Sequence, residues 1–290
     1  MHTHQNDTTG FKPSIRSLVA AIAILFLSGI PVAMAASGES SEADEFHNFG
    51  ISLGVFVTNR DSTTRLDGDI PNSGTPIDLE TDLGLSKQDS VFRIDGYYRF
   101  KEKHRIDFSY FDLSRDGSKV LNRTIDFLGE EFLINTQVDA NFDMSIYKIA
   151  YTYSVIQNDS GYLGLSAGLY IADISAGISL TPLEGGLIDG AAASEGVTAP
   201  LPVFGVRGQY NFTEKWMFRG SAEIFVYEYD AYSGSLYDVY AGIDYQWFKN
   251  MAVGIGYNSV KLDVGVSADR FEGNLNWQYD GGLLFFKFEF

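Results

Sequence analysis

The 290-residue sequence contains no cysteine. Disulfide bonds are therefore excluded, and the fold has to be stabilised by side-chain burial and backbone hydrogen bonding. A lipid-modified N-terminus is excluded too, because lipidation at a signal peptide needs a cysteine.

Long hydrophobic runs are scarce as well. The longest, over residues 18–27, follows Lys12 and Arg16 and is too short to cross a bilayer as a helix. The small-residue sequence Ala33-Met34-Ala35 comes next, an arrangement typical of a cleaved secretory signal peptide. We predict a signal peptide over residues 1–35, a mature domain over residues 36–290 and a short flexible acidic segment over residues 37–45.

Basic residues are few. Lys and Arg total 21 against 38 Asp and Glu, which gives a net charge of −17. Removing Lys12, Arg16 and Asp7 with the predicted signal peptide changes the charge to about −18. A chain this acidic repels a phosphate backbone, so we expect no nucleic-acid partner.

Aromatic residues are abundant, with 22 Phe and 17 Tyr, although the mean hydropathy is only −0.06. The two facts agree if apolar and polar residues alternate along strands. Period-two alternation recurs in ten segments and predicts ten β-strands. Their approximate ranges are 46–58, 91–100, 104–115, 147–154, 162–175, 204–210, 216–224, 238–245, 253–258 and 281–290.

The connections between these segments alternate in length. Residues 101–103, 157–160, 213–215 and 249–250 form short polar turns, and longer linkers lie between them. Short periplasmic turns and long outer loops are typical of a closed antiparallel up-and-down transmembrane β-barrel, which is the all-β fold we predict. Eight or twelve strands also fit the pattern. A soluble β-sandwich or lipocalin-like barrel is the competing interpretation, in which the apolar side would face a core.

Aromatic side chains gather where the predicted strands meet the short turns. Such a belt is typical of a membrane–water interface. Its members are Phe100, Tyr153, Tyr162, Phe212, Trp216, Trp247 and Phe290.

The last strand places Phe286, Phe288 and Phe290 on one face, and Lys287 and Glu289 on the other. It resembles the terminal strand of Gram-negative outer-membrane β-barrels, where the aromatic end is an assembly signal. The resemblance implies a cell outer membrane location, with the barrel assembly machinery and periplasmic chaperones as partners during biogenesis.

A second resemblance covers the first two predicted hairpins. Residues 77–85, 93–100 and 104–108 are similar to a recurrent pattern of small, mostly uncharacterised outer-membrane barrels. It implies fold and location, and provides no catalytic residue or ligand.

Charged residues of both signs alternate with the lipid-facing ones and are expected to point into the lumen. A barrel of this size is nearly filled by side chains, so we predict a salt-bridged plug. The network comprises Arg93, Asp95, Arg99, Arg105, Asp107, Arg207, Arg219, Glu223 and Asp244, with Lys148, Asp238, Lys287 and Glu289 on the same face. Small inward residues, including Gly254 and Gly256, leave a narrow channel open as an alternative.

Two linkers offer weaker hypotheses. The first is acidic, and five of its carboxylates are candidate Ca²⁺ or Mg²⁺ ligands: Asp67, Asp69, Asp78, Glu80 and Asp82. A solvated acidic surface is the alternative reading. The third, residues 181–200, is rich in Gly and Ala and is expected to be a mobile flap.

Catalytic signals are absent. Only His47 and His104 follow the predicted signal peptide, and both fall beside the short turns, away from an extracellular substrate. No nucleophile-elbow, zinc-protease or phosphate-loop motif occurs. We expect a non-enzymatic structural or surface-interaction protein whose acidic loops contact lipopolysaccharide, outer-membrane lipids, cations or external partners. A narrow pore for small solutes is the second hypothesis, and a hydrolase the third.

Overall fold

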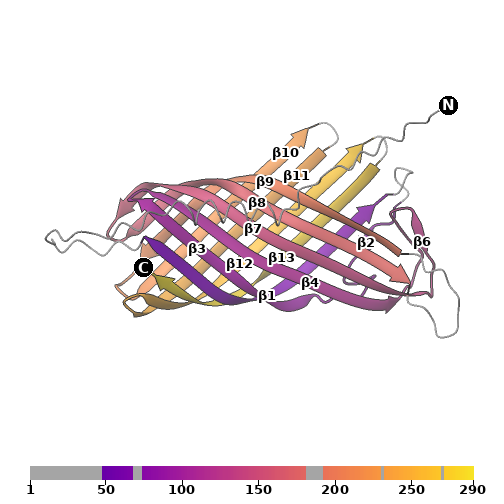
Figure 1. Cartoon of the computed structure of the whole chain (residues 1–290), viewed down its shortest axis with the longest axis horizontal. Helices are drawn as coiled ribbons and strands as arrows, with labels where there is room; N and C mark the ends of the chain where they lie inside the picture. The colour runs from indigo at the N-terminus through magenta and orange to yellow at the C-terminus, as the bar shows by residue number, and fades with distance from the viewer. Residues whose placement is uncertain (1–47, 68–73, 181–191, 230–231, 269–270) are drawn as a thin grey trace, which may run out of the picture. The chain divides into compact units, whose positions relative to one another are not determined.

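The structure, a computed structural model, describes residues 48–67, 74–180, 192–229, 232–268 and 271–290 (Figure 1). The predicted signal peptide, His47 and Asp69 lie outside the described residues. No helix in the described part of the chain has the length and apolar character needed to cross a membrane.

Ten long strands make the wall of a closed antiparallel barrel, which confirms the predicted fold and strand number. They are β1 (Phe49–Leu66), β3 (Gln88–Lys101), β4 (His104–Val120), β7 (Gln137–Asn158), β8 (Gly161–Leu180), β9 (Ala192–Asn211), β10 (Trp216–Tyr229), β11 (Tyr232–Phe248), β12 (Met251–Ala268) and β13 (Phe271–Glu289). Three short strands, β2 (Ile77–Asp78), β5 (Ile125–Phe127) and β6 (Glu130–Phe132), lie in the linkers.

Pairing between the first and last strands closes the barrel. β13 runs antiparallel to β1 from Gly50, opposite Glu289, to Leu66, opposite Gly273. Each of the other wall strands pairs with its neighbour in the chain, with β2, β5 and β6 outside that order. Closure removes the exposed edges that an open sheet would present, which is what a strand-built structure needs in lipid.

The two ends of the barrel differ. At the turn end, residues 102–103, 159–160, 212–215 and 249–250 connect neighbouring strands. At the loop end, the first two connections are residues 67–87 and 121–136. The last two connections there, residues 230–231 and 269–270, are only two residues long, so the expectation of long linkers was wrong for them. The strands themselves are longer instead.

Polarity inverts along each strand, and β7 shows this most clearly. Near the turn end its outward side chains are Tyr147, Ile149, Tyr151, Tyr153 and Val155, and the inward ones include Lys148, Thr152 and Ser154. Toward the loop end the outward side chains become polar, and the inward ones apolar. The outward set there is Asp139, Asn141, Asp143 and Ser145, and the inward set is Val138, Ala140, Phe142, Met144 and Ile146.

The inversion explains why the predicted strands were too short. The sequence reading followed an apolar outer face and stopped where that face became polar. The backbone pairing continues, with the apolar residues now at the inward positions and the polar residues at the outward ones. About ten residues of each strand carry the apolar outer face, the length that a tilted strand needs to cross the hydrocarbon region.

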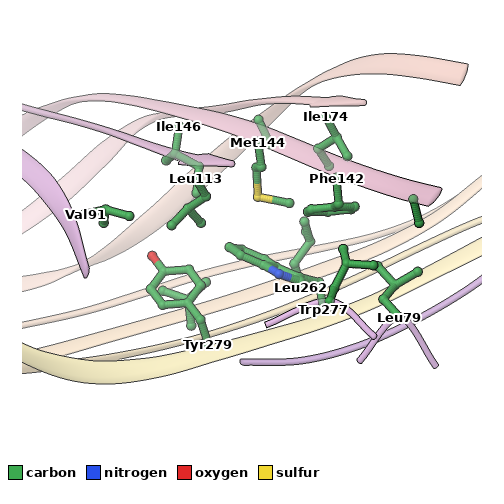
Figure 2. Packing of buried hydrophobic residues seen from close by; sticks show 14 of the residues in the cluster. Leu79, Val91, Leu113, Phe142, Met144, Ile146, Ile174, Leu262, Trp277 and Tyr279 are labelled. Atoms are coloured by element: carbon green, nitrogen blue, oxygen red, sulfur yellow. The ribbon is translucent and has the colours of Figure 1, made fainter. Parts of the chain in front are cut away.

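The loop half contains a hydrophobic core inside the barrel wall. Figure 2 shows Leu113 of β4, Phe142 and Met144 of β7, Leu262 of β12 and Trp277 of β13 gathered there. Linkers fill it further. Ile77, Leu79, Leu83 and Leu85 of the first linker are at most 3% exposed, as are Ile125, Phe127 and Phe132 of the second. The acidic first linker therefore folds inward over the core.

The predicted mobile flap at residues 181–200 was wrong for its second half. Residues 192–200 belong to β9 and pair with β8, with Ala192 opposite Ser179 and Pro200 opposite Ile171. Residues 181–191 lie outside the described residues. Gly and Ala are small enough to occupy a strand, so composition alone does not mark a loop here.

Candidate functional site

The inward charges of the turn half form one connected chain across the lumen. Arg93 on β3 donates to Asp95 at 3.0 Å and to Asn258 on β12 at 2.7 Å. Asn258 donates to Asp238 on β11 at 2.7 Å. Asp238 accepts from Lys148 on β7 at 2.9 Å, so strands on different sides of the barrel are joined through the interior.

The chain continues to the remaining side of the barrel. Lys148 also contacts Glu223 on β10, and Glu223 accepts from Arg207 on β9 at 2.8 Å. Arg207 lies 3.5 Å from Asp107 on β4, which accepts from Arg105 at 2.7 Å. Four cations and four carboxylates are thereby linked, so the charges within this network balance.

A second, smaller group lies beside the first. Arg219 on β10 and Lys287 on β13 both contact Asp244 on β11, at 2.7 Å and 3.6 Å. Lys287 also pairs with Glu289 at 2.7 Å, and Glu289 accepts from the Tyr97 hydroxyl at 2.7 Å. This group is also charge-balanced.

Arg99, the remaining member of the predicted network, lies beside two aromatic rings. Its guanidinium carbon sits 5.8 Å from the Tyr97 ring centre and 5.9 Å from that of Tyr162. The structure therefore brings together eight of the nine predicted lumen residues. It adds Asn258, Thr152 and Tyr97, polar residues that a search for charges alone does not find.

The space beside the small inward residues is occupied. A Cβ on Gly254 would lie 2.2 Å from the Phe285 ring, and one on Gly256 would lie 2.7 Å from the Tyr240 ring. Aromatic rings thus fill the positions that sequence reasoning left open for a channel. The cavity within the network has a volume of only about 70 Å³, room for a few water molecules.

The first-linker carboxylates engage the protein itself. Asp67 accepts from the Gly74 amide at 2.9 Å, Glu80 pairs with Arg115 at 2.5 Å, and Asp82 pairs with Arg123 at 2.5 Å. Asp78 accepts from the Thr81 amide at 2.6 Å. Among the described residues there is no group of three or more His, Cys, Asp or Glu that could hold a metal ion, and Asp69 lies outside those residues.

His104 begins β4 at the turn end. Its Nδ1 lies 2.6 Å from the Tyr151 hydroxyl, and its ring packs with Phe100 and Tyr153. These neighbours make it part of the aromatic belt.

On β4, β7 and β8, the outer face of the loop half carries charge of one sign. The outward residues of β4, β7 and β8 above the apolar band include five aspartates and, within the described ranges, no Lys or Arg. They are Asp112, Asp116, Asp139, Asp143 and Asp173. Asp112 accepts from Ser145 at 3.0 Å and Asp173 from Thr198 at 3.0 Å, so local hydroxyls hold the carboxylates in place. We call these five residues the acidic face.

No protein-family model and no curated protein matches this chain. Among solved structures, the outer membrane protease OmpT from Escherichia coli matches with a TM-score of 0.53 and 11% identity, over 87% of this chain and all of that one. The chain has the outer-membrane β-barrel fold. Further matches are OprG from Pseudomonas aeruginosa (TM-score 0.35, 12% identity, 84% of this chain and 96% of that one) and Ail from Yersinia pestis (TM-score 0.31, 12% identity, 83% and 99%). At these identities the likeness concerns the fold alone.

Proposed function

We propose that this chain is a non-enzymatic outer-membrane protein, closed to solutes, that presents a rigid acidic surface outside the membrane. The main support for this proposal is the inversion of polarity along the strands of the wall. An apolar outside around a charged interior suits lipid, and an acidic outside around an apolar interior suits water. The turn half would therefore span the bilayer, and the loop half would stand above it as a β-structured platform.

Two successive barriers support the closed lumen. The connected charge network crosses the turn half, and the hydrophobic core with its inward-folded linkers fills the loop half. An ion would have to break buried salt bridges and then enter an apolar layer, and both steps are costly.

The acidic face supports a contact with divalent cations. At the height where the apolar band ends, it would meet the phosphate-bearing headgroups of lipopolysaccharide, which repel carboxylates unless divalent cations bridge the two. Mg²⁺ or Ca²⁺ between the Asp112, Asp143 and Asp173 carboxylates and lipid phosphates is the contact we propose.

Planar-bilayer recording on the refolded full chain tests the closed lumen. We expect no discrete openings, and regular single-channel steps would favour the pore hypothesis instead.

Copurification of lipopolysaccharide with and without Mg²⁺ tests the surface contact. The variant D112N/D143N/D173N should lose Mg²⁺-dependent binding. The control D61N/D263N/D280N removes the same charge from β1, β12 and β13, where Asp263 and Asp280 already have partners in Lys261 and Tyr257. Equal loss in both variants would refute a role for the acidic face and reduce the effect to net charge.

A further inference from the structure

The barrel wall is split between β9 and β10 toward the loop end. The two strands pair from Asn211, opposite Met217, only as far as Phe204, opposite Ile224. β9 continues to Ala192 and β10 to Tyr229, but beyond Phe204 β9 is paired with β8 alone. Figure 1 shows the β10–β11 hairpin pointing away from the outer end of β9.

Two prolines account for the split. Pro200 and Pro202 lie in β9 immediately beyond the last pair with β10. In an antiparallel strand, residues two apart direct their N–H groups to the same neighbour, and proline has no N–H. The edge facing β10 therefore lacks two successive donors, while the opposite edge pairs with β8 without interruption. The position fits the rule that prolines within sheets occupy free edges.

An apolar cavity of about 470 Å³ lies inside the loop end beside the free part of β9. Val197 and Ala199 of β9 line it, with Phe142, Ile174 and Leu275 from other strands. Gly196, Ala176 and Gly273 contribute little or no side chain to the lining and keep the space open. Its volume falls in the range of small-molecule sites.

Apolar side chains lie on both faces of β9 between the split and this cavity. Phe204 and Val226, the outward side chains flanking the split, are 62% and 63% exposed, within the apolar band. On the inner side of the same segment, Leu201 and Val203 are at most 8% exposed and belong to the core. A hydrocarbon chain entering at the split would have to displace Leu201 and Val203, and would contact apolar side chains there.

We infer that the cavity binds a single hydrocarbon chain of a membrane lipid, which enters from the bilayer through the split between β9 and β10. The lining offers dispersion contacts and few hydrogen-bond partners, which suits an alkyl chain and disfavours a sugar or a peptide. Glu195, exposed on the lining, would face water and keep a phosphate headgroup outside. The inference stands apart from the proposed cation-bridged contact.

Tryptophan fluorescence with brominated lipids provides the test, since bromine quenches only nearby fluorophores. Trp277 is 1% exposed and points inward two residues from Leu275, whereas Trp216 and Trp247 lie on the outer surface near the turn end. In W216F/W247F protein in vesicles with brominated acyl chains, we expect Trp277 to be quenched. Adding Ala199→Phe or Ala176→Phe, from two different strands, should fill the cavity and lower the quenched fraction.

The access route is tested by Pro200→Thr/Pro202→Thr, which restores the missing donors without touching the cavity lining. Closure of the split would appear as slower hydrogen exchange at the β10 amides of residues 225–229. With the split closed, lipid quenching should fall. A brominated fatty acid added from water should still enter past Glu195 and Val197, which line the cavity and are exposed, and should still quench Trp277.

Two results would overturn the inference. The first is that neither cavity-filling variant changes the quenching of Trp277, although heat-modifiable gel migration shows that both variants fold. The hydrocarbon chain would then bind outside the cavity. Lipid quenching unchanged in a proline variant whose amides are protected would refute the lateral route.

Discussion

Glu80 of the first linker and Arg115 of β4 form a buried salt bridge at 2.5 Å, with both side chains 1% exposed. A second Glu80 oxygen accepts from the Ser62 amide on β1 at 3.0 Å. The contact holds an acidic linker against the barrel interior, where its leucines pack. A residue that sequence reasoning assigned to a metal site or a solvated loop therefore has a structural role.

Removing Glu80 should destabilise the loop half. In Glu80→Ala, Arg115 keeps its charge in a buried site without its carboxylate, which costs about 3 to 5 kcal/mol. Denaturant titration in detergent micelles measures the change in the free energy of unfolding. Glu130→Ala, an exposed carboxylate on β6, is the control and should change it by less than about 0.5 kcal/mol. Equal stability of the two variants would contradict the proposed role of the salt bridge.

Arg60 and Arg115 should respond in opposite ways to replacement by Met. Arg60 is 1% exposed, its guanidinium donates no hydrogen bond to any described residue, and its nearest carboxylate, on Asp89, is 3.6 Å away. Burial, with a smaller contribution from nearby Arg115, lowers the pKa of Arg60 to about 10. Folding therefore disfavours its charged form below that pH.

Arg60→Met should leave stability unchanged or raise it by about 1 kcal/mol at neutral pH, because the desolvation penalty disappears. Arg115→Met should destabilise by several kcal/mol, because Glu80 is then buried unpaired. Urea midpoints of the two variants, compared with wild type, decide this. A large loss of stability in Arg60→Met would show that its contact with Asp89 outweighs burial.

Glu223 should be the most sensitive position in the lumen network. It bridges Lys148 and Arg207, so Glu223→Ala leaves two buried cations with less compensation and should lower stability by about 3 to 5 kcal/mol. Glu228, exposed on the same strand, is the matched control for Ala substitution. Gel heat-modifiability reports the temperature of unfolding, and equal temperatures for the two variants would mean that water already solvates the network.

The limit of the apolar band can be tested on β13. Phe286 and Gln278 are both exposed, lie eight residues apart and face outward. Phe286→Asp should reduce insertion into the membrane by about 1 to 3 kcal/mol, because a carboxylate at that depth loses its hydration. Gln278→Asp should insert normally. Equal insertion of the two would place Gln278 in lipid and refute the polarity inversion.

In the terminal strand, Glu289 is not a suitable control for a substitution at Phe290. From the sequence alone, with Phe290 on the apolar face and Glu289 on the polar one, Phe290 is predicted to tolerate substitution less well than Glu289. Glu289 is 9% exposed and contacts Lys287 and Tyr97, so substitution there should also destabilise the barrel. A role of Phe290 in assembly is better judged against an exposed position such as Gln278.

The sequence by itself predicted a closed barrel and favoured ten strands over eight or twelve. Alternation with period two is a local pattern, and it can be recognised in any strand that has one polar face and one apolar face. It also determined which charges point inward, because residues two apart share a face. Eight of the nine predicted lumen charges belong to the two groups of contacts described above.

Only the tertiary structure decided what the loop half does. In the loop half the same alternation continues with the faces exchanged, and period two alone does not say which face is the core. That choice depends on the linkers, where Ile77, Leu79 and Leu83 turn inward and bring Glu80 to Arg115 across 35 positions of the sequence. The split beside β9 had a local signal in Pro200 and Pro202. Its consequence, an apolar cavity with a lateral opening, depends on strands that are distant in the chain and meet only when the barrel closes.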